Sequence, residues 1–94
     1  MTTKSLKVTT EELAAKYNVP FTIIESLDRY VDHRVPTGGF LNAVLANDLR
    51  ESCARADWDN RSRIFEITNF CYNEIPAICW GSYEKVDEWL KRKS

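Results

Sequence analysis

Residues Pro36 to Glu51 read PTGGFLNAVLANDLRE, a short loop that leads into an apolar helix. Thr37 can accept hydrogen bonds from the first free amides of a helix, and the two glycines after it allow backbone angles that are closed to other residues. Apolar residues then recur at helical spacing and share one face: Phe40, Leu41, Val44, Leu45 and Leu49. Because such a stripe needs partners on other segments, we expect residues 39–56 to form the central helix of the fold.

The flanking segments show the same periodicity. Thr9 or Thr10 precedes two glutamates, which is an N-cap signal for a short helix that ends near Asn18. Longer helices are expected over residues 20–33, 60–74 and 83–93. The sequence therefore predicts an all-α fold, a compact bundle of four main helices with a short additional N-terminal helix. We expect residues 1–8 to be a flexible arm and residues 9–94 to form a single helical domain.

Composition and charge limit the classes of function. The 94 residues are 44% apolar and 29% charged, which suits one small globular domain. Thirteen basic and fourteen acidic residues give a net charge of -1, without the basic excess that is typical of proteins that neutralise phosphates. No apolar run approaches the length of about 18 residues that a membrane span needs, and the N-terminus lacks the apolar core of a signal peptide. We expect a cytoplasmic protein with no membrane partner.

The side chains that could act in catalysis or bind a metal do not form a recognisable pattern. Cys53, Cys71 and Cys79 are odd in number and match no zinc-binding spacing, which favours reduced, buried thiols that pack as small apolar groups. A small enzyme that uses Cys79 as nucleophile and His33 as base is the alternative. We expect no catalysis, no cofactor and no metal.

The candidate protein-binding residues lie in the middle of the chain. Trp58 stands between Asp57 and Asp59, where a large ring could be an exposed hot spot for a partner or could fold over the end of the bundle. Trp80 and Trp89 are expected in the core. Three polar residues on the expected central helix complete the candidate set: Asp48, Glu51 and Arg55. Their alternative role is a solvated helix face, with Asp48 also able to cap the start of another helix.

Several short motifs, in their order along the chain, carry a resemblance. They are LDRYVDH at 27–33, PTGGFLNAVLANDL at 36–49, RAD at 55–57, YNEIP at 72–76, CWGS at 79–82 and KVDEWL at 85–90. Over about residues 20–93 the chain resembles a group of small, mostly uncharacterised proteins encoded by bacteriophages and prophages. The resemblance implies an intracellular phage accessory protein and transfers no catalytic residue.

These observations favour a non-enzymatic accessory protein that binds a host or phage protein, for example to inhibit a host process such as defence. Self-association is a related expectation, because the broad apolar arc of residues 64–75 could be completed by a second copy. The alternative is a nucleic-acid-binding accessory or regulatory protein, with four arginines as phosphate contacts: Arg29, Arg34, Arg61 and Arg63.

Overall fold

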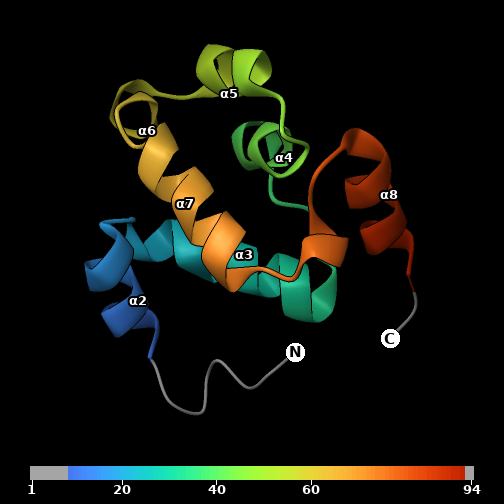
Figure 1. Ribbon diagram of the computed structural model, residues 1–94, viewed down its shortest axis with the longest axis horizontal. Coiled ribbons are helices and arrows are strands. Elements are labelled where there is room, and N and C mark those ends of the chain that lie inside the picture. The colour runs from blue at the N-terminus through green and yellow to red at the C-terminus, as the bar shows by residue number, and fades with distance from the viewer. Residues whose placement is uncertain (1–8, 93–94) are drawn as a thin grey trace.

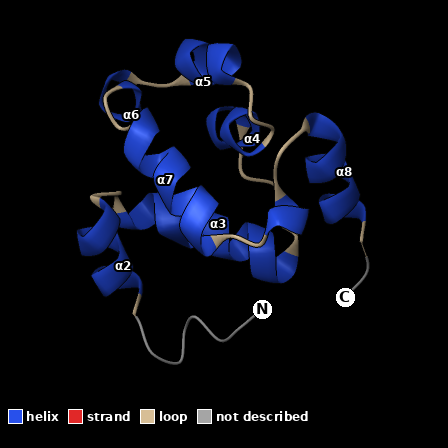
Figure 2. Cartoon of the chain, viewed as in Figure 1, coloured by secondary structure: helices blue, strands red, loops and turns tan. Residues whose placement is uncertain are grey.

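The computed structural model describes residues 9–92, and within this range its regular elements are all helices, joined by loops and turns, as Figure 2 shows. Seven α-helices and one 3₁₀ helix follow one another through these residues (Figure 1). Their bounds are α2 Thr10–Tyr17, α3 Phe21–His33, α4 Gly39–Leu45, α5 Leu49–Arg55, α6 Trp58–Arg61, α7 Ile64–Glu74, η1 Ala77–Cys79 and α8 Tyr83–Lys91. The all-α prediction is confirmed, whereas the count of four main helices plus one is too low. The expected arm of residues 1–8 lies outside the described residues.

Local capping explains where the outer helices begin. Thr9 and Glu12 form a reciprocal capping box at the start of α2, in which each side chain accepts the other residue's backbone amide. Ser82 caps α8 by accepting from the amide of Lys85. Of the two threonines that the sequence offered as the cap of the first helix, Thr9 is the one used.

The expected central helix of residues 39–56 is wrong, because the chain breaks after Leu45 into α4 and α5. Asn47 adopts the left-handed conformation with φ of 63°. Its amide donates to Val44 and the amide of Asp48 donates to Ala43, the hydrogen-bond pair of a Schellman motif. The Asp48 side chain then accepts from the amide of Glu51 and starts α5 in a new direction.

Two further expectations about helix starts are corrected. Gly38, with φ of 103° and no side chain, is the N-cap of α4, and the Thr37 hydroxyl instead donates to the Gly38 carbonyl oxygen at 3.3 Å. The expected helix over residues 60–74 consists of the single turn α6 followed by α7, with a turn at residues 62 and 63 between them.

The core is one cluster of apolar side chains that draws on every described helix except α5 and α6. Its fully buried large members are Tyr30, Phe70, Ile24, Leu27, Leu45, Ile67 and Cys79. Trp80 and Trp89 are half-buried and pack against this cluster. Helix α2 packs on α3 and α7, while α4 lies between α5 and α8. Figure 1 shows α5 and α6 at one edge of the molecule, so they are the elements with most surface to offer.

Helix α8 is tied to the body by hydrogen bonds from both of its ends. The Gly81 amide, just before the helix, donates to the Leu45 carbonyl oxygen at 2.7 Å. Near the other end, the indole N–H of Trp89 donates to the Tyr30 carbonyl oxygen at 2.9 Å. The Arg34 guanidinium lies 4.3 Å from the centre of the Trp89 ring, a cation–π contact that fixes the ring further.

Candidate functional site

Trp58 is the most exposed of the large apolar residues in the described chain, with 81% of its surface accessible to solvent. It begins α6, a single turn that buries none of its own residues. The turn is held by Asp57, whose carboxylate accepts from the Asn60 amide at 2.8 Å. The alternative in which the ring folds over the end of the bundle is therefore wrong, and α6 presents the indole to solvent.

Trp58 has charged residues beside it in sequence and one near its ring in space. Asp57 and Asp59 flank it in sequence and are both exposed, and the Arg61 guanidinium lies 5.9 Å from the ring centre. Trp58, Arg61 and Ser62 line a shallow hollow of about 200 Å³. An apolar ring with a charged rim is the arrangement found at energetically dominant positions of protein–protein interfaces.

The other three candidate residues lie on or next to α5 and already have partners within the chain. Glu51 and Arg55 form an exposed ion pair at 3.0 Å, one helical turn apart. Asp48 accepts from the Tyr83 hydroxyl at 2.7 Å as well as from the Glu51 amide. These two hydrogen bonds, the one from Tyr83 foremost, lower the pKa of the Asp48 carboxyl below its ordinary value.

The six candidates thus fall into two groups, one around Trp58 on α6 and one on α5. Sequence reasoning missed Arg61 beside Trp58, although its spacing of three residues on a helix was the available signal. It also missed Tyr83 as the partner of Asp48, since a contact between residues 35 positions apart leaves no local trace.

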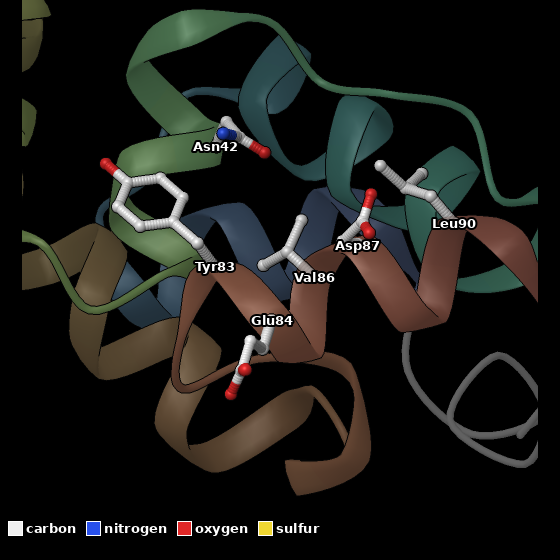
Figure 3. Close-up of a pocket in the computed structure, with 6 residues that line it drawn as sticks. All are labelled: Asn42, Tyr83, Glu84, Val86, Asp87 and Leu90. Atoms are coloured by element: carbon white, nitrogen blue, oxygen red, sulfur yellow. The ribbon is translucent and has the colours of Figure 1, made fainter.

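A hollow of about 420 Å³ lies between α4 and α8, and two of its four polar side chains are already engaged within the chain. Figure 3 shows Asn42 of α4 facing Tyr83 and Val86 of α8, while Glu84 points to the opposite side. Of the groups that line it, the Tyr83 hydroxyl is bound to Asp48 and the Asp87 carboxylate pairs with Lys91 at 2.9 Å.

The thiols are placed in two different environments. Cys71 and Cys79 are buried, as expected, and burial raises the pKa of Cys71 to about 12 and that of Cys79 to about 11. A thiol with such a pKa is protonated near neutral pH and is a poor nucleophile. Cys53 is exposed, contrary to expectation, because α5 lies outside the core. His33 is exposed at the last turn of α3.

The described part of the chain offers neither a metal-binding cluster nor a membrane-spanning helix. Residues 9–92 contain no group of three or more His, Cys, Asp or Glu side chains placed to hold a metal ion. Within the same range, every helix is too short or too polar to cross a membrane.

Comparison of the chain with protein-family models, with curated proteins and with solved structures found no match. The candidate site is therefore described by its geometry alone. This geometry defines the class of protein as a small all-α domain with exposed aromatic side chains.

Proposed function

We propose that this chain is a non-enzymatic accessory protein that binds another protein through Trp58 and the charged residues around it. The observation that carries the proposal is the exposure of Trp58 on a helical turn that contributes nothing to the core. Indole rings with charged surroundings contribute binding energy only when a partner covers them. The turn is held by its own aspartate cap, so the ring is presented in a defined orientation before any partner arrives.

The resemblance to phage and prophage proteins supports the biological setting of this proposal. We infer a phage accessory protein that acts in the cytoplasm of the host cell on a host or phage protein, with inhibition of a defence system as one such action. Nothing in this setting requires a cofactor.

Two of the four arginines that a nucleic-acid-binding role would use are engaged within the chain. Arg34 lies on the Trp89 ring, and Arg63 donates to the Asn18 carbonyl oxygen at 3.0 Å. Since phosphate binding depends on free cations gathered on one face, the geometry favours a protein ligand.

The test compares the natural chain with Trp58→Ala. The immobilised protein is exposed to lysate of phage-infected host cells, the recovered protein is identified by mass spectrometry, and its purified form is titrated against both chains. We expect Trp58→Ala to weaken the affinity at least about tenfold, as loss of a hot-spot tryptophan does. Its helix content should not change, because α6 buries none of its residues.

Ile78→Ala is the matched control, since Ile78 is an exposed apolar residue on η1, outside the candidate site. It should bind like the natural chain. Equal affinity of the natural chain and Trp58→Ala would refute the proposal. Recovery of DNA or RNA that is lost steeply as salt rises would favour the nucleic-acid alternative.

A further inference from the structure

Helix α7 is apolar on two opposite sides. Its inner side buries Ile67, Phe70 and Cys71 in the core. Its outer side presents Phe65 and Tyr72, which are 75% and 71% exposed although they are large aromatic residues. A helix that is apolar on both sides is normally covered on both sides, and residues 9–92 cover only one side of α7.

The outer side of α7 continues into the turn between α4 and α5. One hollow of about 350 Å³ is lined by Asn47, Phe65, Thr68, Asn69, Tyr72 and Trp80. A second hollow of about 240 Å³ shares Asn47 and Thr68 with the first and extends to Leu49, which is 66% exposed. The two hollows and their walls form one surface, which we call the α7 face: Asn47, Leu49, Phe65, Thr68, Asn69, Tyr72 and Trp80.

The α7 face carries no charged side chain of its own. Neither acidic residue of α7 lines the two hollows: Glu74 accepts from the Tyr17 hydroxyl at 2.7 Å, and one carboxylate oxygen of Glu66 is buried. Asp48 is the one charged residue that lines either hollow, and its carboxylate accepts from the Tyr83 hydroxyl and the Glu51 amide. Apart from Asp48, the lining residues can meet an identical face around a two-fold axis without bringing like charges together.

The face is also built to keep its shape. The Trp80 indole N–H donates to the Ile75 carbonyl oxygen at 3.1 Å, and the Tyr72 ring packs edge-on against Trp80 at 6.2 Å between ring centres. The protruding rings and the hollows beside them therefore exist before association. Preformed knobs and hollows of this kind lower the entropic cost of association.

We propose that the α7 face is the two-fold interface between two copies of this chain, with the exposed rings of each copy packing into the hollows of the other. Two aromatic rings, Leu49 and their smaller neighbours offer about 600 Å² on each copy, judged from the area that aromatic side chains bury. Two copies would then bury about 1,200 Å² in total, the lower bound of specific protein–protein interfaces. This inference does not depend on the role of Trp58.

The experiment is sedimentation equilibrium of the full chain from about 1 µM to about 1 mM, the range of weak to moderate dimers. The mass should rise from 10.9 kDa toward twice that value. In the double variant Phe65→Glu, Tyr72→Glu each new carboxylate would lose its water in the interface, close to the same carboxylates of the other copy. The mass should therefore stay at 10.9 kDa over most of the range. Because both positions are exposed, circular dichroism should show unchanged helix content.

Ile78→Glu places the same charge on an exposed apolar residue outside the α7 face, and it should dimerise like the natural chain. Raising the salt concentration should preserve or strengthen the dimer, since uncharged apolar contacts are not screened. A mass of 10.9 kDa throughout the range would refute the proposal. So would unchanged dimerisation of the folded double variant, or a different protein that occupies this face on a single copy.

Discussion

Two adjacent glycines at the start of α4 have different roles. Gly38 has φ of 103° and ψ of 170°, a backbone region that is essentially restricted to glycine, and no atom would crowd a Cβ added there. Gly39 has ordinary helical geometry, but a Cβ would lie 3.0 Å from Nη1 of Arg55, which crosses over it from α5. The first glycine is needed for its backbone, whereas the second only makes room for a flexible side chain.

We therefore expect Gly38→Ala to lower the free energy of unfolding by about 1–3 kcal/mol through backbone strain alone. Gly39→Ala should change it by less than about 1 kcal/mol, because the end of Arg55 can move and alanine favours the helix. Urea denaturation of both variants measures the difference. Equal losses for the two variants would contradict this distinction.

At the scale of elements, the sequence predicted most of the helices and several of their caps. It did not predict the break between α4 and α5, because Leu41, Val44, Leu45 and Leu49 keep helical spacing straight through it. The break depends on hydrogen bonds that Asn47 and Asp48 make locally and on the contact of Asp48 with Tyr83. The spacing of apolar residues carries no information about these polar hydrogen bonds.

The attachment of α8 to α3 is an element-scale feature that a single substitution tests. Trp89→Phe removes the indole N–H that donates to Tyr30 and weakens the contact with Arg34. The Tyr30 carbonyl oxygen keeps the Arg34 amide at 3.1 Å but loses the indole N–H, so we expect a loss of about 0.5–1.5 kcal/mol in unfolding free energy, the net value of one hydrogen bond.

Amide hydrogen exchange locates this effect. In Trp89→Phe the amides of α8 should exchange faster while those of α3 and α7 keep their order, since the lost contacts belong to α8. Trp58→Phe, which changes an exposed indole, is the control and should leave exchange unaltered. Uniformly faster exchange in every helix would mean that α8 does not open separately.

At the scale of the whole molecule, folding encloses phenol and thiol groups that resist ionisation. Burial first, and then the hydrogen bond to Glu74, raises the pKa of Tyr17 to about 12. Burial likewise raises the pKa of Tyr30, of Cys71 to about 12 and of Cys79 to about 11. The hydroxyl of Tyr30 donates to the Cys79 carbonyl oxygen at 2.6 Å, so its neutral form is also needed for a buried contact.

Each of these pKa values is higher in the folded chain than in the unfolded chain, so their contribution to stability is complete below the ordinary values of about 9 for the thiols and about 10 for the phenols. It is lost as the pH rises through about 11 and about 12. We expect the urea midpoint to fall steadily above about pH 9. Tyr17→Phe should fall less steeply above about pH 10, because one ionising phenol is absent from its unfolded state. A flat midpoint up to about pH 11 would contradict the assignment.

The sequence predicted the candidate site better for Trp58 than for the α7 face. The two flanking aspartates singled out Trp58 as a candidate, although the sequence left open whether its ring is exposed or folds over the end of the bundle. The outward position of Phe65 and Tyr72, by contrast, depends on which side of α7 the other helices cover. Residues 64–75 showed a broad apolar arc, but only the packing of the other helices decides which part of that arc stays open.

The interruption after Leu45 has a consequence for engineering. In an unbroken helix the Leu45 carbonyl would accept from the amide of residue 49, whereas here it is available to the Gly81 amide at 2.7 Å. A redesign that fused residues 39–55 into one rod would compete for this acceptor and weaken the attachment of the C-terminal segment, which the Trp89 indole would still hold at its other end. The turn at residues 46–48 therefore helps to hold α8 in place, and replacing Asn47 to make this turn rigid would loosen α8.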